Sequence, residues 1–267
     1  MAYTEIDDPT IYFNTVLYTG NSTGSTQQAI SGVGFSPNMV WIKSRTDAEK
    51  HSIADTVRGT TKTIHPSDNS AEETSAGHMV SFDSDGFTVG VDNYSWNKSG
   101  SAYVSWNWKE SATAGFDICS WTGNGSAQNI SHNLSKVPTM IIVKNRTDSG
   151  TDWYCYNVHN GNTHSILLNS TGAKVGAYTD NWNNTTPTSS VFTVGSSNST
   201  GGSSSDNMIA YVFTDIKGYS KFGSYTGNGN ADGTFVYTGF KPAFVIRKDP
   251  MQLKVGKCMI IKEIHLM

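Results

Sequence analysis

The hydrophobic positions of this chain fall in short runs that are separated by polar turns rich in Gly, Ser, Thr and Asn. Met39–Ile42 and Met140–Val143 are uninterrupted apolar runs, which are typical of strands buried on both faces. Residues 103–108 alternate with period two, which predicts one dry and one wet face. Ser84-Asp85-Gly86 is typical of a hairpin turn between two such runs. No long stretch has the 3.6-residue period of an amphipathic helix, so the pattern predicts an all-β protein.

Short motifs recur along the chain in the same order, at a spacing of about a hundred residues. An aromatic residue followed by Thr-Gly-Asn occurs at residues 18–21, 121–124 and 225–228, and a proline before an apolar run occurs at residues 37, 138 and 242. Phe-Thr-Val-Gly occurs at residues 87–90 and 192–195, and Ala-Tyr-Val at residues 102–104 and 210–212. We interpret the glycine of the first motif as a turn residue that adopts positive φ. The ordered recurrence indicates a repeated unit.

This pattern predicts tandem antiparallel β-sandwich repeats of the jelly-roll or lectin-like type. The first repeat covers residues 1–110, the second covers 111–218, and a truncated third begins at 219–250. Residues 109–113 are too few for a free linker, so the first two units should pack against each other. The truncated third unit should leave strands within residues 235–248 with unpaired edges that need a partner.

Residues 251–267 do not follow the repeat, because they are rich in Lys, Met and Ile and contain a single Gly. We interpret them as an aberrant tail. A frameshift that replaced the rest of the third unit would explain it. The encoding nucleotides test this hypothesis, since an early stop codon in the shifted frame would contradict it.

Composition and charge narrow the range of functions. The formal net charge is -3 and the basic residues are scattered, so there is no electrostatic footprint for nucleic acid. No apolar window is long enough to span a bilayer, and the polar N-terminus does not resemble a signal peptide. We therefore expect synthesis in the cytoplasm without membrane insertion. The three cysteines, an odd number, are expected to be small buried hydrophobes rather than a disulfide framework.

The acidic residues predict neither a metal site nor a cofactor. Asp83, Asp85 and Asp92 lack the ligand spacing of a calcium loop, and a hairpin turn explains the first two better. Glu72 and Glu73 are expected on a solvated loop rather than in an acid/base pair.

The histidines and the glycine-rich stretches do not indicate a catalytic or phosphate-binding site either. His51 and His65 are expected on surface loops. The chain has no G-x-S-x-G elbow and no P-loop. We therefore predict that the protein is not an enzyme.

Carbohydrate binding is the best-supported ligand chemistry, because sugar sites combine aromatic rings with amide side chains. Tyr94, Trp96 and Asn97 form one such group, and Trp182 with Asn183 forms another. These five are the candidate ligand-binding residues. The alternative is that both tryptophans cap the ends of a sandwich core, as expected for a residue that is usually largely buried.

Several segments together resemble a repeat family of tail-fibre-like and other virion structural proteins in marine bacteriophages. They are YTEIDDP at residues 3–9, LYTGN at 17–21, VWIK at 40–43, SFDSDGF at 81–87 and KFGSYTGN at 221–228. The resemblance covers residues 1–249 and departs at the tail, where family members complete a third unit. It implies a role in the virion and supplies no catalytic residues.

From this resemblance we expect a tail-associated fibre or adhesin module that attaches to the host surface. The expected partners are other virion proteins, a host surface glycan or protein, and further copies of the chain in a homo-oligomer. The alternative is a capsid decoration or connector protein with no ligand. A glycan depolymerase is less favoured, because no acid/base pair is identifiable.

Overall fold

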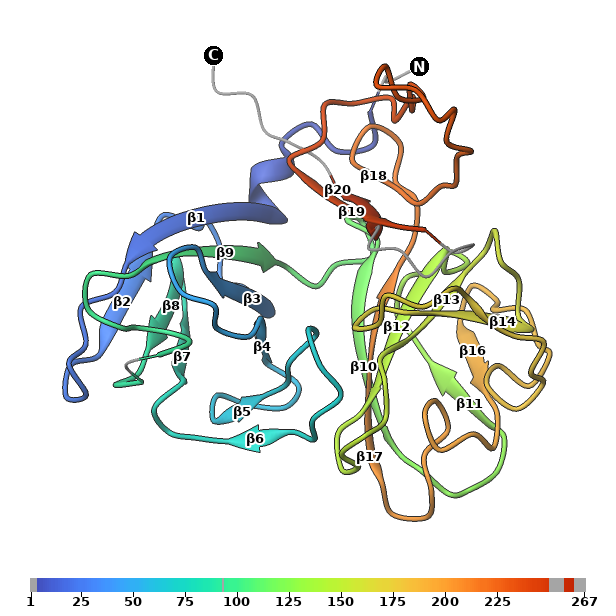
Figure 1. Ribbon diagram of the computed structural model, residues 1–267, viewed down its shortest axis with the longest axis horizontal. Helices are drawn as coiled ribbons and strands as arrows, with labels where there is room; N and C mark the ends of the chain where they lie inside the picture. The colour runs from blue at the N-terminus through green and yellow to red at the C-terminus, as the bar shows by residue number, and fades with distance from the viewer. Residues whose placement is uncertain (1–3, 93, 250–256, 262–267) are drawn as a thin grey trace.

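The computed structural model describes residues 4–92, 94–249 and, by their backbone, 257–261 (Figure 1). Within these residues the chain is built of β-strands, which confirms the all-β prediction. A short 3-10 helix, η1 (Pro9–Ile11), precedes the first strand. It begins after Asp8, whose side chain accepts a hydrogen bond from the Thr10 amide at 2.9 Å.

The first unit, residues 4–110, contains three antiparallel sheets. Its strands are β1 (Phe13–Thr19), β2 (Gln28–Ser31), β3 (Met39–Ser44), β4 (Ser52–Asp55), β5 (Lys62–Thr63), β6 (Glu73–Thr74), β7 (Met79–Asp83), β8 (Gly86–Val89) and β9 (Ala102–Trp108). The sheet orders are β1-β9-β3-β4, β2-β8-β7 and β5-β6. Asp83 pairs with Gly86 across the β7–β8 turn, so the predicted hairpin is confirmed.

The second unit, residues 111–218, contains two antiparallel sheets, one of six strands and one of two. Its strands are β10 (Phe116–Thr122), β11 (Gln128–Ser131), β12 (Met140–Asn145), β13 (Tyr154–Asn157), β14 (His164–Leu167), β15 (Val175–Gly176), β16 (Val191–Val194) and β17 (Asn207–Phe213). The order β10-β17-β12-β13-β14-β15 starts as β1-β9-β3-β4 does. The pair β11-β16 corresponds to β2-β8.

The third unit starts at residue 219 and contains one small antiparallel sheet. Its strands are β18 (Ser220–Lys221), β19 (Phe244–Lys248) and β20 (Lys257–Ile261), in the order β18-β20-β19. Ile261 pairs with Ser220 on one side and with Phe244 on the other. Trp108 in β9 pairs in the same way with one residue of β1 and one of β3. The backbone of β20 therefore takes the place that the last strand has in the other units.

The tail interpreted from the sequence is only partly described. Residues 257–261 belong to β20, whereas 251–256 and 262–267 lie outside the described residues. The frameshift hypothesis stays a prediction.

Three hydrophobic cores result from this arrangement: one inside the first unit, one inside the second, and one shared between all three. In β3, Val40 and Ile42 face the core of their own unit, whereas Met39 and Trp41 face the shared core. Strand β12 divides its side chains in the same way. The uninterrupted apolar runs are thus explained by burial on both faces.

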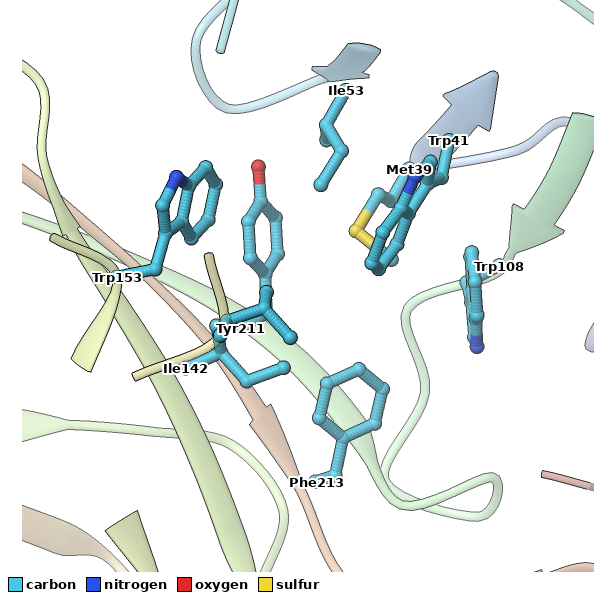
Figure 2. A pocket seen from close by; sticks show the side chains of 9 residues that line it. Met39, Trp41, Ile53, Trp108, Ile142, Trp153, Tyr211 and Phe213 are labelled. Carbon is cyan, nitrogen blue, oxygen red and sulfur yellow. The ribbon is translucent and has the colours of Figure 1, made fainter. Parts of the chain in front are cut away.

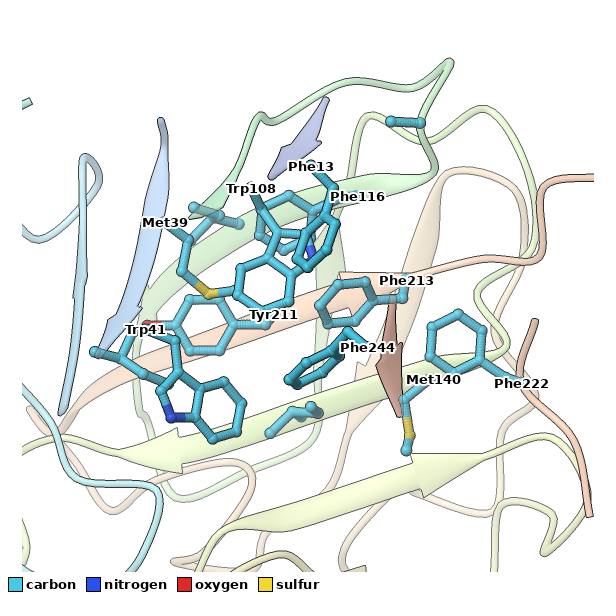
Figure 3. Close-up of a cluster of buried hydrophobic side chains, with 14 of the residues drawn as sticks. Phe13, Met39, Trp41, Trp108, Phe116, Met140, Tyr211, Phe213, Phe222 and Phe244 are labelled. Atoms are coloured by element: carbon cyan, nitrogen blue, oxygen red, sulfur yellow. The ribbon is translucent and has the colours of Figure 1, made fainter. Parts of the chain in front are cut away.

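The shared core lies where the inner sheets of the three units meet (Figures 1 and 3). Its large side chains include Phe13, Met39, Trp41 and Trp108 of the first unit, Phe116, Met140, Trp153, Tyr211 and Phe213 of the second, and Tyr219, Phe222 and Phe244 of the third. This packing also corrects one prediction. The expected wet face of β9 is buried, because Ser105 and Asn107 are 0% exposed. On the opposite, apolar face the rings of Trp106 and Trp108 lie 5.3 and 5.5 Å from that of Phe244.

A buried ionic network joins the first unit to the second. Arg58 donates to Asp55 at 2.5 Å in the first unit, and the Tyr211 hydroxyl of the second donates to the same carboxylate at 2.6 Å. Arg58 also donates to Glu72, which accepts two further hydrogen bonds from the Arg146 guanidinium at 2.7 and 2.9 Å. The Glu72 side chain is 10% exposed, so its expected place on a solvated loop is wrong. Its charge is balanced by arginines of both units.

The expected position of His65 on a surface loop is also wrong. Its side chain is buried, and its carbonyl accepts a hydrogen bond from Trp153 Nε1 of the second unit at 2.9 Å. His51 is half-buried and accepts a hydrogen bond from Trp41 Nε1 at 3.0 Å. Glu73 has an exposed side chain, as expected. The segment around residues 65–75 is therefore partly an interface between units.

Candidate ligand-binding groove

Both tryptophans among the candidate ligand-binding residues lie inside cores. Trp96 is 0% exposed and stacks on His78 at 5.6 Å, and Trp182 is 1% exposed and lies edge-on to Tyr156. The Trp182 Nε1 donates to Ser165 Oγ at 2.9 Å. Because neither ring has a face open to solvent, neither can stack on a sugar in this conformation. The structure places both as core residues, which is the alternative considered for them.

The neighbours of Trp96 differ in exposure. Asn97 is fully buried, and its side chain donates to the carbonyls of Thr26 and Gly90 at 3.0 and 2.9 Å. Its Oδ1 accepts from the Asn21 amide, so the side chain joins loops rather than facing a ligand. Tyr94 has a largely exposed side chain. The segment does not bring its three candidate residues together on one surface.

Asn183 is exposed and lines a shallow polar hollow of about 480 Å³. Asn183 and Asn184 both adopt positive φ, at 48° and 47°, which amide side chains tolerate better than most. The other lining residues are Gly125, Ser126, Ala127, Thr179, Asp180 and Ser196. An aromatic platform is not part of this lining, so the hollow offers hydrogen bonds without a stacking surface.

A second opening, which we call the β10–β11 groove, combines both features. It has a volume of about 410 Å³ and lies between β10 and β11, which are outer strands of two different sheets of the second unit (Figure 1). Its lining residues are Asp117, Ile118, Cys119, Ser120, Trp121, Gln128, Asn129, Ile130, Ser131 and Asn133. The groove follows the open side of the unit, where the two sheets are not hydrogen-bonded to each other.

The groove presents hydroxyl and amide groups beside an indole ring. Ser120, Asn129 and Ser131 are exposed, and Trp121 is half-buried. The indole is held from behind, because Nε1 donates to the Gly201 carbonyl at 3.3 Å and the ring lies edge-on to Phe192 at 5.9 Å. Aromatic surface with convergent polar groups suits a polyol ligand. Sequence reasoning missed this site because it treated Trp121 only as part of the repeated motif.

Asp117 lines the groove, and the Glu110 carboxyl group is hydrogen-bonded to it. Burial and a hydrogen bond with Asp117 raise the pKa of Glu110 to about 7. Burial opposes ionisation of Asp117 too, but the bonds from Glu110 and Asn133 outweigh it and lower the pKa of Asp117. The Asn133 amide donates to Asp117 at 2.6 Å, and the Ile118 amide donates to Glu110 at 3.4 Å. These two backbone bonds tie the pair to β10 and to the chain that follows β11.

The corresponding edge of the first unit has different chemistry. Leu17 occupies the position of Ser120 and is 60% exposed, and Tyr18 occupies that of Trp121. Tyr18 donates its hydroxyl to the Trp96 carbonyl at 2.7 Å, much as Trp121 donates to Gly201. The two edges therefore differ at these positions, although Gln28 and Ser31 of β2 match Gln128 and Ser131 of β11.

A serine, a histidine and a glutamate also come together in the first unit. Ser52 Oγ lies 3.4 Å from His65 Nδ1, and His65 Nε2 lies 3.3 Å from Glu73. The same Nδ1 lies 2.9 Å from the His51 carbonyl, which can only accept, so this nitrogen carries a proton and cannot take one from Ser52. Ser52 is also fully buried. The arrangement lacks both a free base and an accessible nucleophile.

A small cavity lies in the shared core between Trp41, Trp108, Trp153 and Tyr211 (Figure 2). Its space for a water-sized sphere is about 10 Å³, at the lower limit for holding one water molecule. The walls are apolar, so we interpret it as a packing gap between units.

Two of the cysteines lie buried in the cores. Cys119 and Cys155 are free and buried, and burial raises the pKa of the Cys155 thiol to about 12. In the described part of the chain, His, Cys, Asp and Glu do not form a group of three that could hold a metal ion. No helix within the described ranges is long and apolar enough to cross a membrane.

Comparisons with known proteins give one assignment. No curated protein and no solved structure is significantly similar to the chain. A family model described as a domain of unknown function, DUF7483, matches residues 8–254. The match extends over all three units, as the shared core does. Because it covers most of the sequence, the chain belongs to the DUF7483 family.

Proposed function

We propose that this protein is a non-enzymatic structural component of a marine bacteriophage particle, and that it serves as a tail-associated fibre or adhesin module. In this proposal it is made in the host cytoplasm, assembles with other virion proteins and further copies of itself, and attaches to the host surface. The β10–β11 groove carries the binding part of the proposal, because Trp121 and its polar neighbours suit a surface glycan.

We infer that the first two units are antiparallel sandwiches of the jelly-roll or lectin-like type, and that the third is a truncated copy. Matching hydrogen bonds support this inference. The Gly20 amide donates to the Ser101 carbonyl at 2.9 Å, and the Gly123 amide donates to the Asp206 carbonyl at 2.8 Å. Gln28 and Gln128 each donate a side-chain hydrogen bond to the last strand residue before their loop, Thr19 or Thr122.

The carboxyl groups favour binding over hydrolysis. A glycosidase holds its two carboxyl groups roughly 5 to 9.5 Å apart, so that they flank the scissile bond. Glu110 and Asp117 are instead hydrogen-bonded to each other, and both also accept backbone amides. A glycan depolymerase is therefore less favoured than an adhesin.

The alternative is a capsid decoration or connector protein with no ligand. The exposed apolar residues of the third unit, Phe235 and Tyr237 above all, favour this alternative because they suit contacts with other particle proteins.

A pair of matched variants tests glycan binding in the groove. Ser120→Arg would fill the groove with a long side chain, whereas Leu17→Arg places the same side chain at the equivalent exposed edge of the first unit. We expect the wild-type protein and Leu17→Arg to bind host cells and the same spots on a glycan array, and Ser120→Arg to lose at least tenfold in affinity. Equal binding by the two variants would exclude the groove as the glycan site.

Location in the particle separates the two candidate functions. Gold-labelled antibody against the chain, viewed on intact particles by electron microscopy, should decorate the tail if the adhesin proposal is correct. Label on the head would favour the decoration protein. Release of oligosaccharides from host glycan by the purified protein would revive the depolymerase.

A further inference from the structure

The polar hollow that Asn183 lines, which we call the Asn183 hollow, is adjacent to the β10–β11 groove. Their linings meet in the chain, because Ala127 belongs to the hollow and Gln128 to the groove. The pairing of β11 with β16 also places them together (Figure 1). Gln128 lies opposite Val194, and Ser196 of the hollow follows Val194 by two residues. The two openings, of about 410 and 480 Å³, are therefore neighbours on the surface of the second unit.

The boundary between the two openings is held in place by hydrogen bonds. Gln128 Nε2 donates to the Thr122 carbonyl at 3.3 Å, which joins the two ends of the loop between β10 and β11. The Gly125 amide in this loop donates to the Gly202 carbonyl at 3.1 Å. Because the loop is tied at its ends and at its centre, a ligand meets a boundary of fixed shape.

The opposite wall of the Asn183 hollow is a turn that Trp182 anchors. The Thr185 amide donates to the Trp182 carbonyl at 2.9 Å and closes the turn that Asn183 and Asn184 form. The Trp182 ring is buried in the core of the second unit. The two amide side chains therefore extend from a backbone whose shape is fixed before a ligand binds.

The polar side chains around the Asn183 hollow keep their hydrogen-bonding capacity. All six are exposed, and within the described part of the chain none of them forms a side-chain hydrogen bond or an ion pair. They are Ser126, Thr179, Asp180, Asn183, Asn184 and Ser196. Hydroxyl, amide and carboxylate groups are suitable partners for the hydroxyl groups of a sugar. The hollow therefore offers hydrogen bonds, whereas the groove adds the stacking surface of Trp121.

Charge limits the kind of sugar that both openings accept. Asp117 lines the groove and Asp180 lines the Asn183 hollow, and neither lining contains Lys, Arg or His. An acidic sugar would bring its carboxylate towards like charge, without a cation in the lining to offset it. The hydroxyl groups of a neutral sugar can instead donate to these carboxylates. The pair of openings thus favours a neutral ligand.

We propose that the Asn183 hollow and the β10–β11 groove are two subsites of one site, and that its ligand is a neutral, unbranched oligosaccharide. One sugar packs on Trp121 in the groove, the chain crosses Ala127 and Gln128, and sugars further along bind in the hollow by hydrogen bonds. A single sugar fills only one opening, so affinity should rise with chain length until both are filled. This inference rests on the proposed glycan-binding function and extends it to the length and charge of the ligand.

A ladder of oligosaccharides tests the proposal with the full-length protein. The probes are fluorescently labelled fragments from partial acid hydrolysis of the host-cell surface polysaccharide, separated by size and, by anion exchange, into neutral and acidic fractions. Fluorescence anisotropy should show binding of the neutral fragments by wild type, with at least tenfold higher affinity for the longest than for the shortest that binds. Acidic fragments of the same length should bind at least tenfold more weakly.

Variants in each opening separate the two subsites. Ser126→Arg places a long side chain in the hollow, so it should lose at least tenfold in affinity for the longest neutral fragments and keep wild-type affinity for the shortest. Asn184→Gly removes one amide but keeps the turn, because glycine tolerates positive φ, and should lose about threefold for the longest fragments. Ser120→Arg should weaken binding at every length. Leu17→Arg is the matched control and should behave as wild type.

Four results would overturn the proposal. They are equal affinity of wild type for short and long fragments, wild-type binding of long fragments by both hollow variants, an equal loss at every length in Ser126→Arg, and tighter binding of the acidic fragments. If Ser120→Arg still loses binding in these cases, the groove alone is the glycan site and the proposed function stands. Absence of binding to any fragment, by a wild-type protein that is folded by circular dichroism, would contradict the proposed function itself and this inference with it. Matching thermal unfolding of the variants would show that the comparison is between folded proteins.

Discussion

The ring of Phe244 in the third unit lies perpendicular to that of Trp108 in the first, with their centroids 5.5 Å apart (Figure 3). Phe244 also contacts the rings of Phe13, Trp41 and Trp106. It lies within a group of aromatic side chains that belong to the inner sheet of the first unit. Phe244 is therefore one of the residues that hold the third unit against the rest of the molecule, together with Phe222.

Replacing Phe244 by alanine should destabilise the whole protein. Removing a buried phenylalanine costs about 3 kcal/mol or more, because apolar contacts are lost and a cavity remains. We expect a corresponding fall in the free energy of unfolding in urea. Phe235→Ala is the matched control, because its ring is exposed and its loss should change that free energy by less than about 0.5 kcal/mol. Similar losses for the two variants would contradict the role of Phe244.

The repeated glycines should differ in their tolerance of alanine. Gly20→Ala and Gly123→Ala force a methyl group against a backbone carbonyl, so the chain must move in a packed region. We expect each to lower the free energy of unfolding by about 2 kcal/mol or more, the range for overpacked sites. Gly227→Ala has open space and should be neutral. Thermal unfolding of the three variants checks this order, and a destabilising Gly227→Ala would show that the third unit is covered in solution.

These glycines also show what sequence reasoning could and could not achieve. Their recurrence, with that of the prolines and apolar runs, was sufficient to predict an all-β chain with repeating motifs, because strand periodicity and turn chemistry are local properties. The physical reason for the glycines was misassigned. Gly20 and Gly123 are required for close approach to a carbonyl from the far end of the unit, not for positive φ. Such a contact between residues far apart in the chain cannot be predicted from the neighbouring sequence.

The site residues illustrate the same limit. Trp96 and Trp182 stand in turn-rich, Asn-containing stretches that read as exposed, yet both rings fill cores. Glu72 is surrounded by polar residues in the sequence, but arginines from two units neutralise it. Arg58 and Tyr211 are far apart along the chain, so a local pattern could not predict their contact. Burial that depends on packing between units cannot be predicted from the sequence pattern of one unit.

The ionic network that joins the first two units should be sensitive to truncation. Arg58→Met removes the cation that neutralises the Asp55 carboxylate, and the side chains of both residues are 0% exposed. Loss of one partner of a buried pair costs about 3 kcal/mol or more, because the other charge stays buried. Urea unfolding should show this loss. Lys136→Met breaks an exposed pair with Glu5 and should cost less than about 1 kcal/mol. Comparable losses would indicate that water reaches Asp55.

Glu110 should make stability depend on pH between about 4.5 and 7. Its pKa in the folded protein is about 7, against 4.5 for an unperturbed glutamate, so the folded state keeps a proton that the unfolded state releases in this window. A state that binds more protons is favoured at low pH, and the free energy of unfolding must therefore fall as the pH rises from 4.5 through 7. Above this window both states are ionised and the loss is complete.

Glu110→Gln isolates this contribution, because the neutral amide cannot ionise and can still donate to Asp117. We expect the free energy of unfolding of the variant, relative to that of wild type, to rise by about 1 to 2 kcal/mol from pH 5 to pH 8. This is less than the full linkage value, because Glu110 is only half-buried. Urea unfolding at the two pH values measures this difference. In Glu5→Gln the free energy of unfolding should change between the two pH values as it does in wild type. The reason is that the pKa of Glu5 is lowered by its bond to Lys136, so its carboxylate does not titrate in this range. If the free energy of unfolding of Glu110→Gln has the same pH dependence as that of wild type, then water screens the carboxyl pair. The edge of β10 would then be more open than its hydrogen bonds indicate.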